Sequence, residues 1–233
     1  MSDKPRHSKR YGLSKLDPQW REKIFASLHS QRLKLAVAVL SCSGCRPAEL
    51  ERGVIVRFHN NQLQLGIYGS KVDAQTGRGQ PVRLLVVDQS RTWAQFLISE
   101  LCRHESRHMT IKYDAGGISQ RLREKSREIW PRRKTLISGY TYRHFMGKSM
   151  KESGETAEKI AVTLGHASDF SQGCYGRSGS GKRSAGQHGI LAAGATNPVR
   201  HSPKTDRLER FIKPVEKNAS SVESVGNCSR FST

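Results

Sequence analysis

The first fifty residues carry apolar side chains at helical spacing. Four of them indicate one buried helix face: Trp20, Ile24, Phe25 and Leu28. Residues 33–40 are apolar nearly all round, which is typical of a helix in the protein core. Ser43-Gly44 predicts the end of that helix, and Arg46-Pro47 predicts the start of a short third helix.

From residue 54 the pattern changes to that of β-strands. Three segments are rich in β-branched residues or alternate between polar and apolar ones: 54–58, 62–67 and 82–87. His59-Asn60-Asn61 predicts a turn between the first two, and the Gly-rich residues 69–80 predict a longer loop before the third. A small antiparallel sheet follows from this order.

Helical patterns return after the third strand. Four segments have them: 90–102, 119–130, 141–150 and 156–164. The sequence therefore predicts a mostly helical α+β fold with one small antiparallel sheet. We expect a basic flexible arm over residues 1–15, a folded domain over 16–178 and a low-complexity, disordered tail over 179–233, with a short helix possible at 206–213.

The net charge favours a polyanionic partner. Lys and Arg number 40 against 20 Asp and Glu, which gives a formal charge of +20. Basic side chains that neutralise phosphates release condensed counterions, so nucleic acid is the first expectation, ahead of a membrane surface or a purely basic bias. Aromatic residues make up only 7% of the chain, so base stacking is not the expected binding mode. The sequence has no apolar run of about 18 residues, so it predicts no membrane-spanning helix. We expect a cytoplasmic, nucleoid-associated protein.

The five cysteines do not suggest a disulfide framework, because they are scattered and odd in number. Cys42 and Cys45 form a CxxC pair without a second ligand pair at metal spacing. We interpret this pair as packing at a helix end and expect no metal.

Five residues with reactive or cationic side chains stand in distinctive settings. Arg46 opens a helix in Ser43-Gly44-Cys45-Arg46-Pro47-Ala48-Glu49-Leu50. Arg143 lies in Tyr140-Thr141-Tyr142-Arg143-His144. His166 follows Leu164-Gly165, Tyr175 comes nine residues later, and Lys71 lies in the loop of the predicted hairpin.

This set of residue types suits phosphoryl transfer to a protein hydroxyl. A tyrosine oxygen attacks a phosphodiester in line, and the transition state gathers charge on the non-bridging oxygens. Two guanidinium groups stabilise that charge, and a lysine or histidine protonates the leaving oxygen. A metal ion is not required in such a site.

Together these motifs resemble the tyrosine recombinase (phage integrase) family, from about residue 15 to about residue 178. The family signature comprises an arginine in a T/S-G-x-R-x-x-E-L setting, a hairpin lysine, an H-x-x-R box, an L-G-H box and a tyrosine about nine residues after that last histidine. The resemblance implies the catalytic domain of that family over residues 16–178.

Roles follow from the resemblance position by position. Arg46 and Arg143 would hold the scissile phosphate of double-stranded DNA, and Lys71 would protonate the leaving 5′-oxygen. His166 would bond the phosphate, and Tyr175 would form the 3′-phosphotyrosyl bond. Glu49 would orient the site. The resemblance further implies no cofactor, a homotetramer on DNA, and a segment after the tyrosine, such as 208–212, that docks on a neighbouring subunit.

Two departures from the family pattern matter. Tyr140 stands where the H-x-x-R box begins with histidine, and a phenol is a poor base near neutral pH. His144 matches a frequent family position, with packing as its expected role. Too few residues precede Arg46 for the family's N-terminal DNA clamp, so we expect weak binding or binding that depends on an accessory DNA-binding protein.

Several interpretations remain open. A type IB topoisomerase has a similar catalytic set, and a catalytically degenerate DNA-binding protein would retain the charge without the chemistry. Arg78 and Arg83 lie on the same hairpin as Lys71 and compete for its role. Gly77-Arg78-Gly79 is interpreted as a hairpin tip.

Overall fold

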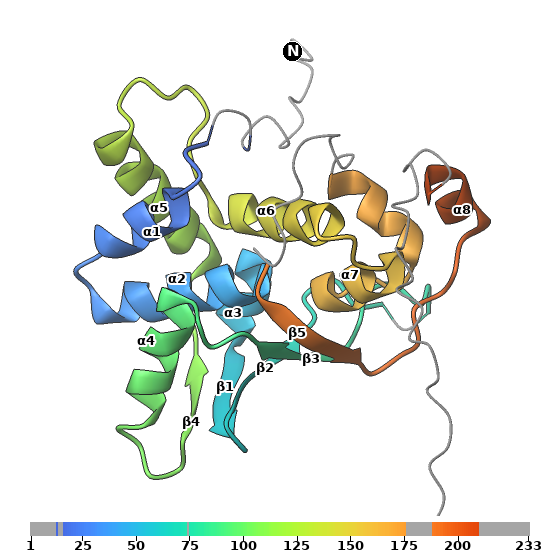
Figure 1. Ribbon diagram of the computed structural model, residues 1–233, viewed down its shortest axis with the longest axis horizontal. Helices are drawn as coiled ribbons and strands as arrows, with labels where there is room; N and C mark the ends of the chain where they lie inside the picture. Colours follow the sequence, from blue (N-terminus) through green and yellow to red (C-terminus); the bar gives the residue numbers. More distant parts are fainter. Residues whose placement is uncertain (1–12, 14–15, 74, 176–187, 210–233) are drawn as a thin grey trace, which may run out of the picture.

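The computed structural model describes residues 13, 16–73, 75–175 and 188–209 (Figure 1). The helices are α1 (Trp20–Ala26), α2 (Gln31–Ser43), α3 (Pro47–Arg52), α4 (Thr92–Leu101), α5 (Ala115–Ile129), α6 (Gly139–Glu152), α7 (Ala157–Leu164), the 3-10 helix η2 (Asp169–Tyr175) and α8 (Pro203–Glu209). The strands are β1 (Val54–His59), β2 (Gln62–Tyr68), β3 (Val82–Val87), β4 (His108–Ile111) and β5 (Ile190–Ala195). The predicted α+β class is confirmed.

All five strands form one antiparallel sheet in the order β4-β1-β2-β3-β5. The three predicted strands are confirmed as its centre, and β4 and β5 add an edge on each side. β4 was not predicted because its four residues are too few to establish a period of two. β5 was not predicted because Ile190 and Leu191 are followed only by Ala and Gly.

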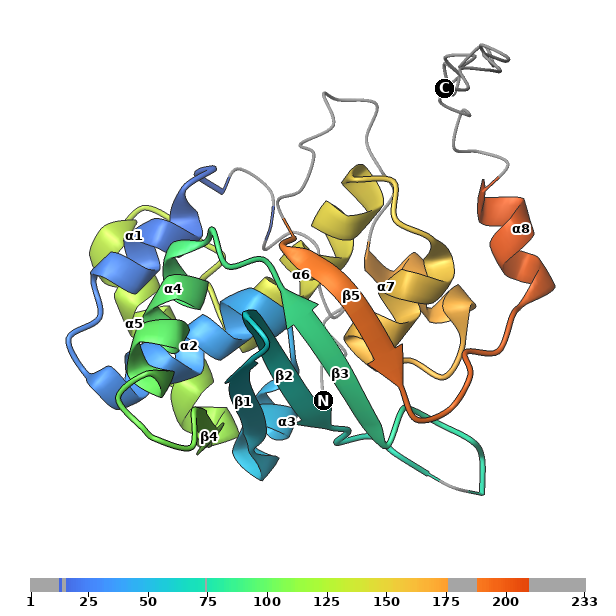
Figure 2. The same ribbon diagram turned by 60° about the horizontal axis from the view of Figure 1, so that its bottom comes forward.

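Helix α2 lies at the centre of the helical part and packs against α1, α4 and α6. Residues 36–40 of this helix have no exposed surface, as their apolar run predicts. α4 packs against β1 at one end of the sheet, while α7 packs against β3 and β5 at the other (Figure 2). The helices thus cover one face of the sheet.

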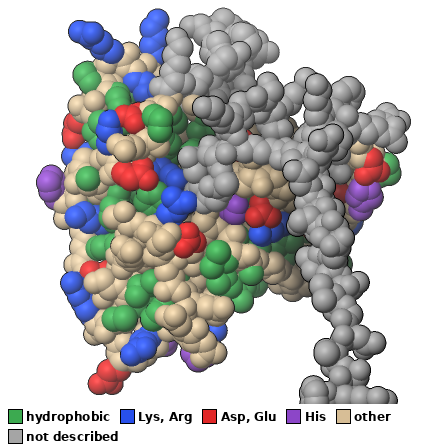
Figure 3. Space-filling view, viewed as in Figure 1, with side chains coloured by type: hydrophobic (Ala, Val, Ile, Leu, Met, Phe, Trp, Pro, Cys, Tyr) green, Lys and Arg blue, Asp and Glu red, His purple; other side chains and the backbone are tan. Residues whose placement is uncertain are grey.

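The opposite face of the sheet remains at the surface. Its exposed apolar side chains come from β2, β3 and β5: Tyr68, Val82, Leu84 and Leu191. Figure 3 shows hydrophobic groups spread from top to bottom of this view, with Lys and Arg scattered rather than gathered in one patch. The sheet therefore has apolar residues on both faces.

Residues 188–209 correct the expectation of a disordered tail from residue 179. They form β5, which pairs with β3, and α8, which begins three residues before the helix suggested at 206–213. Composition failed here because hydrogen bonds to an existing strand order a segment that has few apolar residues of its own. The rest of the tail, including 210–212, lies outside the described residues, as does most of the 1–15 arm.

Cys42 and Cys45 are buried free thiols, as the packing interpretation predicts. Burial raises the pKa of both thiols, to about 11 for Cys45, so neither is a nucleophile at neutral pH. Separately, none of the helices in the described part of the chain has the length and apolar character needed to cross a membrane.

Candidate active site

The site begins where α2 ends. Gly44 takes the left-handed conformation, with φ 58°, and its backbone N–H donates to the Leu40 carbonyl. A Cβ at this position would lie 2.7 Å from the Met146 Cβ, so the turn requires glycine on two grounds. The chain then reverses into α3, with Arg46 as its N-cap residue and Pro47 at its first position.

Glu49 fixes the conformation of this turn. Its Oε2 accepts from the Arg46 backbone N–H at 2.8 Å, and its Oε1 lies 2.5 Å from a guanidinium nitrogen of Arg46. The same carboxylate pairs with Arg83 of β3, at 2.7 Å. Burial alone would raise the pKa of Glu49, but Arg83, Arg143 and Arg46 outweigh it and lower this pKa to about 2. Glu49 is therefore a fully buried carboxylate that stays ionised between arginines.

Arg143 comes from α6 and connects three helix ends. It is 3% exposed, and its Nε donates to the Tyr175 hydroxyl at 2.9 Å. Its terminal nitrogens donate to the carbonyls of Leu164 at 2.5 Å and Gly44 at 3.3 Å. The carbonyls at the ends of α2 and α7 have no partner within their helices, and Arg143 supplies one. These hydrogen bonds in turn hold the guanidinium in one orientation.

His166 follows the left-handed residue Gly165, which ends α7. Its Nε2 lies 2.9 Å from the Tyr175 hydroxyl and 3.2 Å from an Arg143 guanidinium nitrogen. Burial, and then the charges of Arg143 and neighbouring arginines, lower the pKa of His166 to about 2, so the ring is neutral. A guanidinium has donors only, so Nε2 is the acceptor and Nδ1 carries the ring proton.

Tyr175 lies at the end of η2 and is 7% exposed. Its hydroxyl accepts from Arg143 and donates to the acceptor nitrogen of His166. Its ring passes over Gly147 of α6, where a Cβ would lie 2.7 Å from the tyrosine Cγ. His144 packs beside the ring, at 5.4 Å between centroids, in line with the packing role expected for it.

The structure thus brings together four of the six predicted site residues, Arg46, Arg143, His166 and Tyr175, with Glu49. Lys71 is exposed in the loop between β2 and β3, and within the described residues no hydrogen bond or ion pair joins it to this cluster. Tyr140 is half-buried in the first turn of α6, three residues before Arg143.

Arg83 is the residue whose place the sequence reasoning missed. It is 1% exposed and ion-paired with Glu49, so it is not an accessible cation on the hairpin as Lys71 is. A signal was present in the sequence. In β3 the inward positions alternate, and Arg83 shares its side of the strand with the buried Leu85 and Val87.

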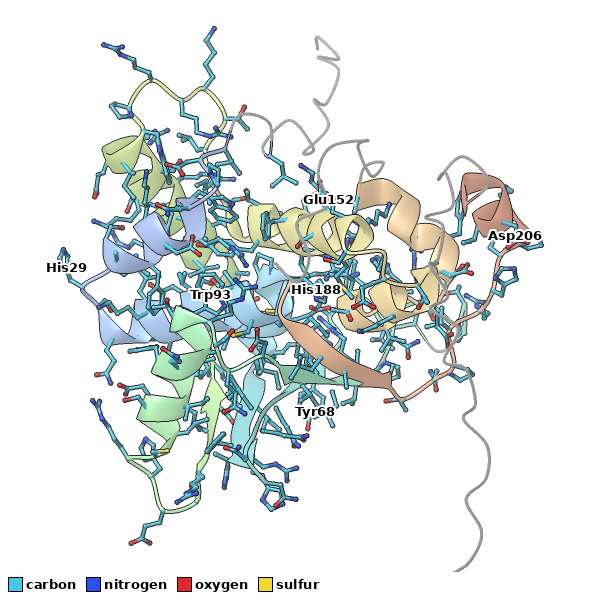
Figure 4. The ribbon with its side chains drawn as sticks, viewed as in Figure 1. His29, Tyr68, Trp93, Glu152, His188 and Asp206 are labelled. Carbon is cyan, nitrogen blue, oxygen red and sulfur yellow. The ribbon has the colours of Figure 1, made fainter. Side chains whose placement is uncertain are left out.

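The start of η2 is anchored by the segment before α8. The Asp169 carboxylate accepts from Ser202 N at 2.9 Å, Thr205 Oγ1 at 2.8 Å and His201 Nδ1 at 2.7 Å. The Asp169 backbone N–H also donates to the Arg200 carbonyl. Figure 4 shows that this segment continues to Asp206 on α8, at the outer end of the molecule. The start of η2, six residues before Tyr175, is therefore fixed by the segment that leads into α8.

No family model and no curated protein matches this sequence. Solved structures resemble it in fold. XerA recombinase superposes with a TM-score of 0.51 at 17% identity, over 69% of this chain and 58% of that one. The fold is tyrosine-recombinase-like.

Two structures of XerH site-specific recombinase also superpose on this chain, at lower similarity. The pre-cleavage complex with difH substrate gives a TM-score of 0.47 at 14% identity, and the post-cleavage complex with palindromic difH substrate gives 0.46 at 16%. Each covers 69% of this chain. The chain spans 58%, 49% and 48% of the three recombinases, less than two thirds of the length of each.

Proposed function

We propose that this chain catalyses site-specific DNA recombination, by cleaving and rejoining strands through a 3′-phosphotyrosyl bond to Tyr175. The observation that carries the proposal is the double hydrogen bond of the Tyr175 hydroxyl, to Arg143 Nε and to His166 Nε2, both at 2.9 Å. A packing tyrosine does not need two such partners. A nucleophile does, because its oxygen must face the phosphorus in one orientation.

In the proposed cleavage step the Tyr175 oxygen attacks the scissile phosphorus. The new oxygen–phosphorus bond forms as the bond from phosphorus to the 5′-oxygen breaks. Arg46 and Arg143 stabilise the charge on the non-bridging oxygens, and Lys71 gives its proton to the leaving 5′-oxygen.

The tyrosine proton passes to His166 Nε2, which already faces the hydroxyl. In the free protein, burial and arginine charges hold the pKa of His166 low. A phosphodiester on those arginines brings a negative charge beside the ring and thereby raises this pKa. Tyr140 would donate a hydrogen bond to the phosphate, since a phenol near neutral pH is a donor rather than a base.

The partners follow from the same proposal. The substrate is double-stranded DNA of a mobile element or replicon, at the nucleoid, and strand exchange requires a homotetramer on two duplexes. The expectation of weak binding, or of help from an accessory DNA-binding protein, is part of this proposal. A net charge of +20 supports phosphate binding of this kind.

Covalent trapping tests the proposal. The protein is mixed with nicked DNA fragments in chelator, stopped with detergent and examined for a DNA–protein adduct, with Tyr175→Phe as the matched control. An adduct that disappears in the variant, on DNA of one sequence, is the expected result. An adduct without sequence preference would favour a type IB topoisomerase, and DNA binding without an adduct would favour a degenerate binding protein.

A further inference from the structure

A third arginine, Arg83 of β3, stands behind the two that face the phosphate. Its guanidinium makes two separate connections. One nitrogen pairs with Glu49 Oε2 at 2.7 Å, and Nε donates to the Thr163 carbonyl at 2.9 Å. The side chain has no exposed surface, so it cannot touch DNA in this conformation.

Both connections lead to the site. Through Glu49, Arg83 reaches the guanidinium of Arg46, which lies 2.5 Å from the other carboxylate oxygen. Through Thr163 it reaches the turn at Gly165 that places His166. A Cβ on Gly165 would lie 2.7 Å from an Arg83 nitrogen, so guanidinium and turn are in direct contact. Gln80, at the base of the same hairpin, donates to the His166 carbonyl at 3.3 Å.

Stability alone is a poor reason for this arrangement. Replacing a buried ion pair by well-packed apolar residues is often neutral or stabilising. In addition, one terminal nitrogen of Arg83 is buried without a hydrogen-bond partner among the described residues, which costs free energy. The arrangement does, however, let one guanidinium, that of Arg83, hold both Arg46 and His166 in place.

We propose that Arg83 is a positioning residue for strand cleavage, which sets the orientation of Arg46 through Glu49 and that of His166 through Thr163. This inference rests on the proposed function. Arg83 acts through other residues, so its removal slows the chemical step at saturating DNA and leaves the affinity for DNA unchanged.

The test compares cleavage of two DNA substrates by wild type and Arg83→Met. One substrate has an ordinary phosphodiester at the scissile position, and the other has a methylphosphonate, which lacks the negative charge that Arg46 stabilises. We expect Arg83→Met to reduce adduct formation about 100-fold on the phosphodiester, the scale of losing one oriented donor. On the methylphosphonate the loss should be less than about 10-fold, since a misplaced Arg46 matters less there.

Arg21→Met is the matched control for a destabilised fold. Arg21 is also a buried arginine, but it lies between the rings of Trp93 and Phe145, with 4.4 Å and 4.2 Å to the ring centroids. Any loss in this variant should be equal on both substrates. If Arg83→Met does not fold, Glu49→Gln removes the same ion pair with little change of shape and should show the same dependence on substrate.

Each outcome is decisive. Equal losses on both substrates, in Arg83→Met or in the folded Glu49→Gln variant, would overturn the positioning role while leaving the proposed function intact. No adduct from wild type on either substrate would overturn the proposed function, and the inference with it. The double variant of Arg83→Met and Glu49→Gln should lose no more cleavage activity than Arg83→Met alone. Such non-additivity would support the proposal, because Arg83 and Glu49 would then act along one path.

Discussion

The proposed function assigns two cations, Arg143 and Lys71, to the same phosphodiester, and the protein surrounds them in opposite ways. Arg143 is 3% exposed and hydrogen-bonded to two backbone carbonyls, to His166 and to Tyr175, the proposed nucleophile. Lys71 is exposed on the β2–β3 loop, and within the described ranges no hydrogen bond or ion pair ties its ammonium to the cluster.

The difference in burial matches the different roles proposed for Arg143 and Lys71. Groups that stabilise charge in the transition state work best when the fold has already oriented them. A group that protonates the leaving oxygen needs to reach an atom that only the bound DNA supplies. Changes in the buried cluster should therefore affect both folding and chemistry, whereas changes at Lys71 should affect chemistry alone.

The largest effect is expected from Arg143→Gln. Cleavage should fall by about 10³-fold or more, because a transition-state donor is lost. The free energy of unfolding should fall by about 3 kcal/mol, because buried carbonyls of Gly44 and Leu164 lose their donor. Adduct formation and denaturant unfolding measure the two effects. Wild-type stability in this variant would contradict the buried role of Arg143.

Lys71→Ala should reduce cleavage about 10² to 10³-fold, the usual scale of general acid catalysis, without changing the melting temperature. A substrate with sulfur in place of the 5′-oxygen should restore the rate, since a thiolate leaves without a proton. Arg78→Ala, an exposed change on the same hairpin, is the control and should have little effect on either substrate. The assignment of Lys71 fails if the sulfur substrate does not rescue its variant.

Gly147→Ala tests how tightly the buried cluster holds the ring of Tyr175. The added methyl would meet the Tyr175 ring at 2.7 Å, so the ring must shift. We expect a loss of about 1–3 kcal/mol in stability, the usual cost of overpacking, and about a 10-fold slower cleavage. Gly194→Ala in β5, where nothing lies within 4 Å of the added Cβ and φ is not positive, controls for a generic glycine effect. Equal rates in the two variants would argue against a tightly placed tyrosine.

The smallest effect is one of protonation. The folded pKa of His166 lies below its unfolded value, so its contribution to stability is complete above about pH 6.5 and falls as the pH decreases. In the free protein its NMR shifts should remain those of the neutral ring from pH 8 to 5. His201, whose pKa the Asp169 hydrogen bond raises, should titrate in the same experiment. A His166 titration near pH 6.5 would refute the buried cluster.

Much of the fold was predictable from local patterns. The centre of the sheet and helices α4 to α7 follow from apolar periods that extend over six residues or more. β5 was not predictable, because its order comes from pairing with a strand about a hundred residues earlier in the chain. The sequence of residues 190–195 alone does not indicate that β3 is available to pair with them.

The candidate site likewise has residues that the sequence predicts and a residue, Arg83, whose place it does not predict. Motif order and spacing indicated Arg46, Arg143, His166 and Tyr175, which the fold brings together. The pairing of Arg83 with Glu49 spans 34 positions and could be found only after β3 and α3 had been placed. The alternation within β3 shows that Arg83 faces inward, but it does not show what the guanidinium meets there.

Gly44 has a consequence for how this protein can change. One residue ends the core helix, lies against Met146 and lends its carbonyl to Arg143. A substitution there would change both thermal stability and the position of Arg143 in the proposed active site. Selection for higher stability therefore cannot change this turn without also changing the site. We expect tolerated stabilising substitutions at positions that do not contact the cluster.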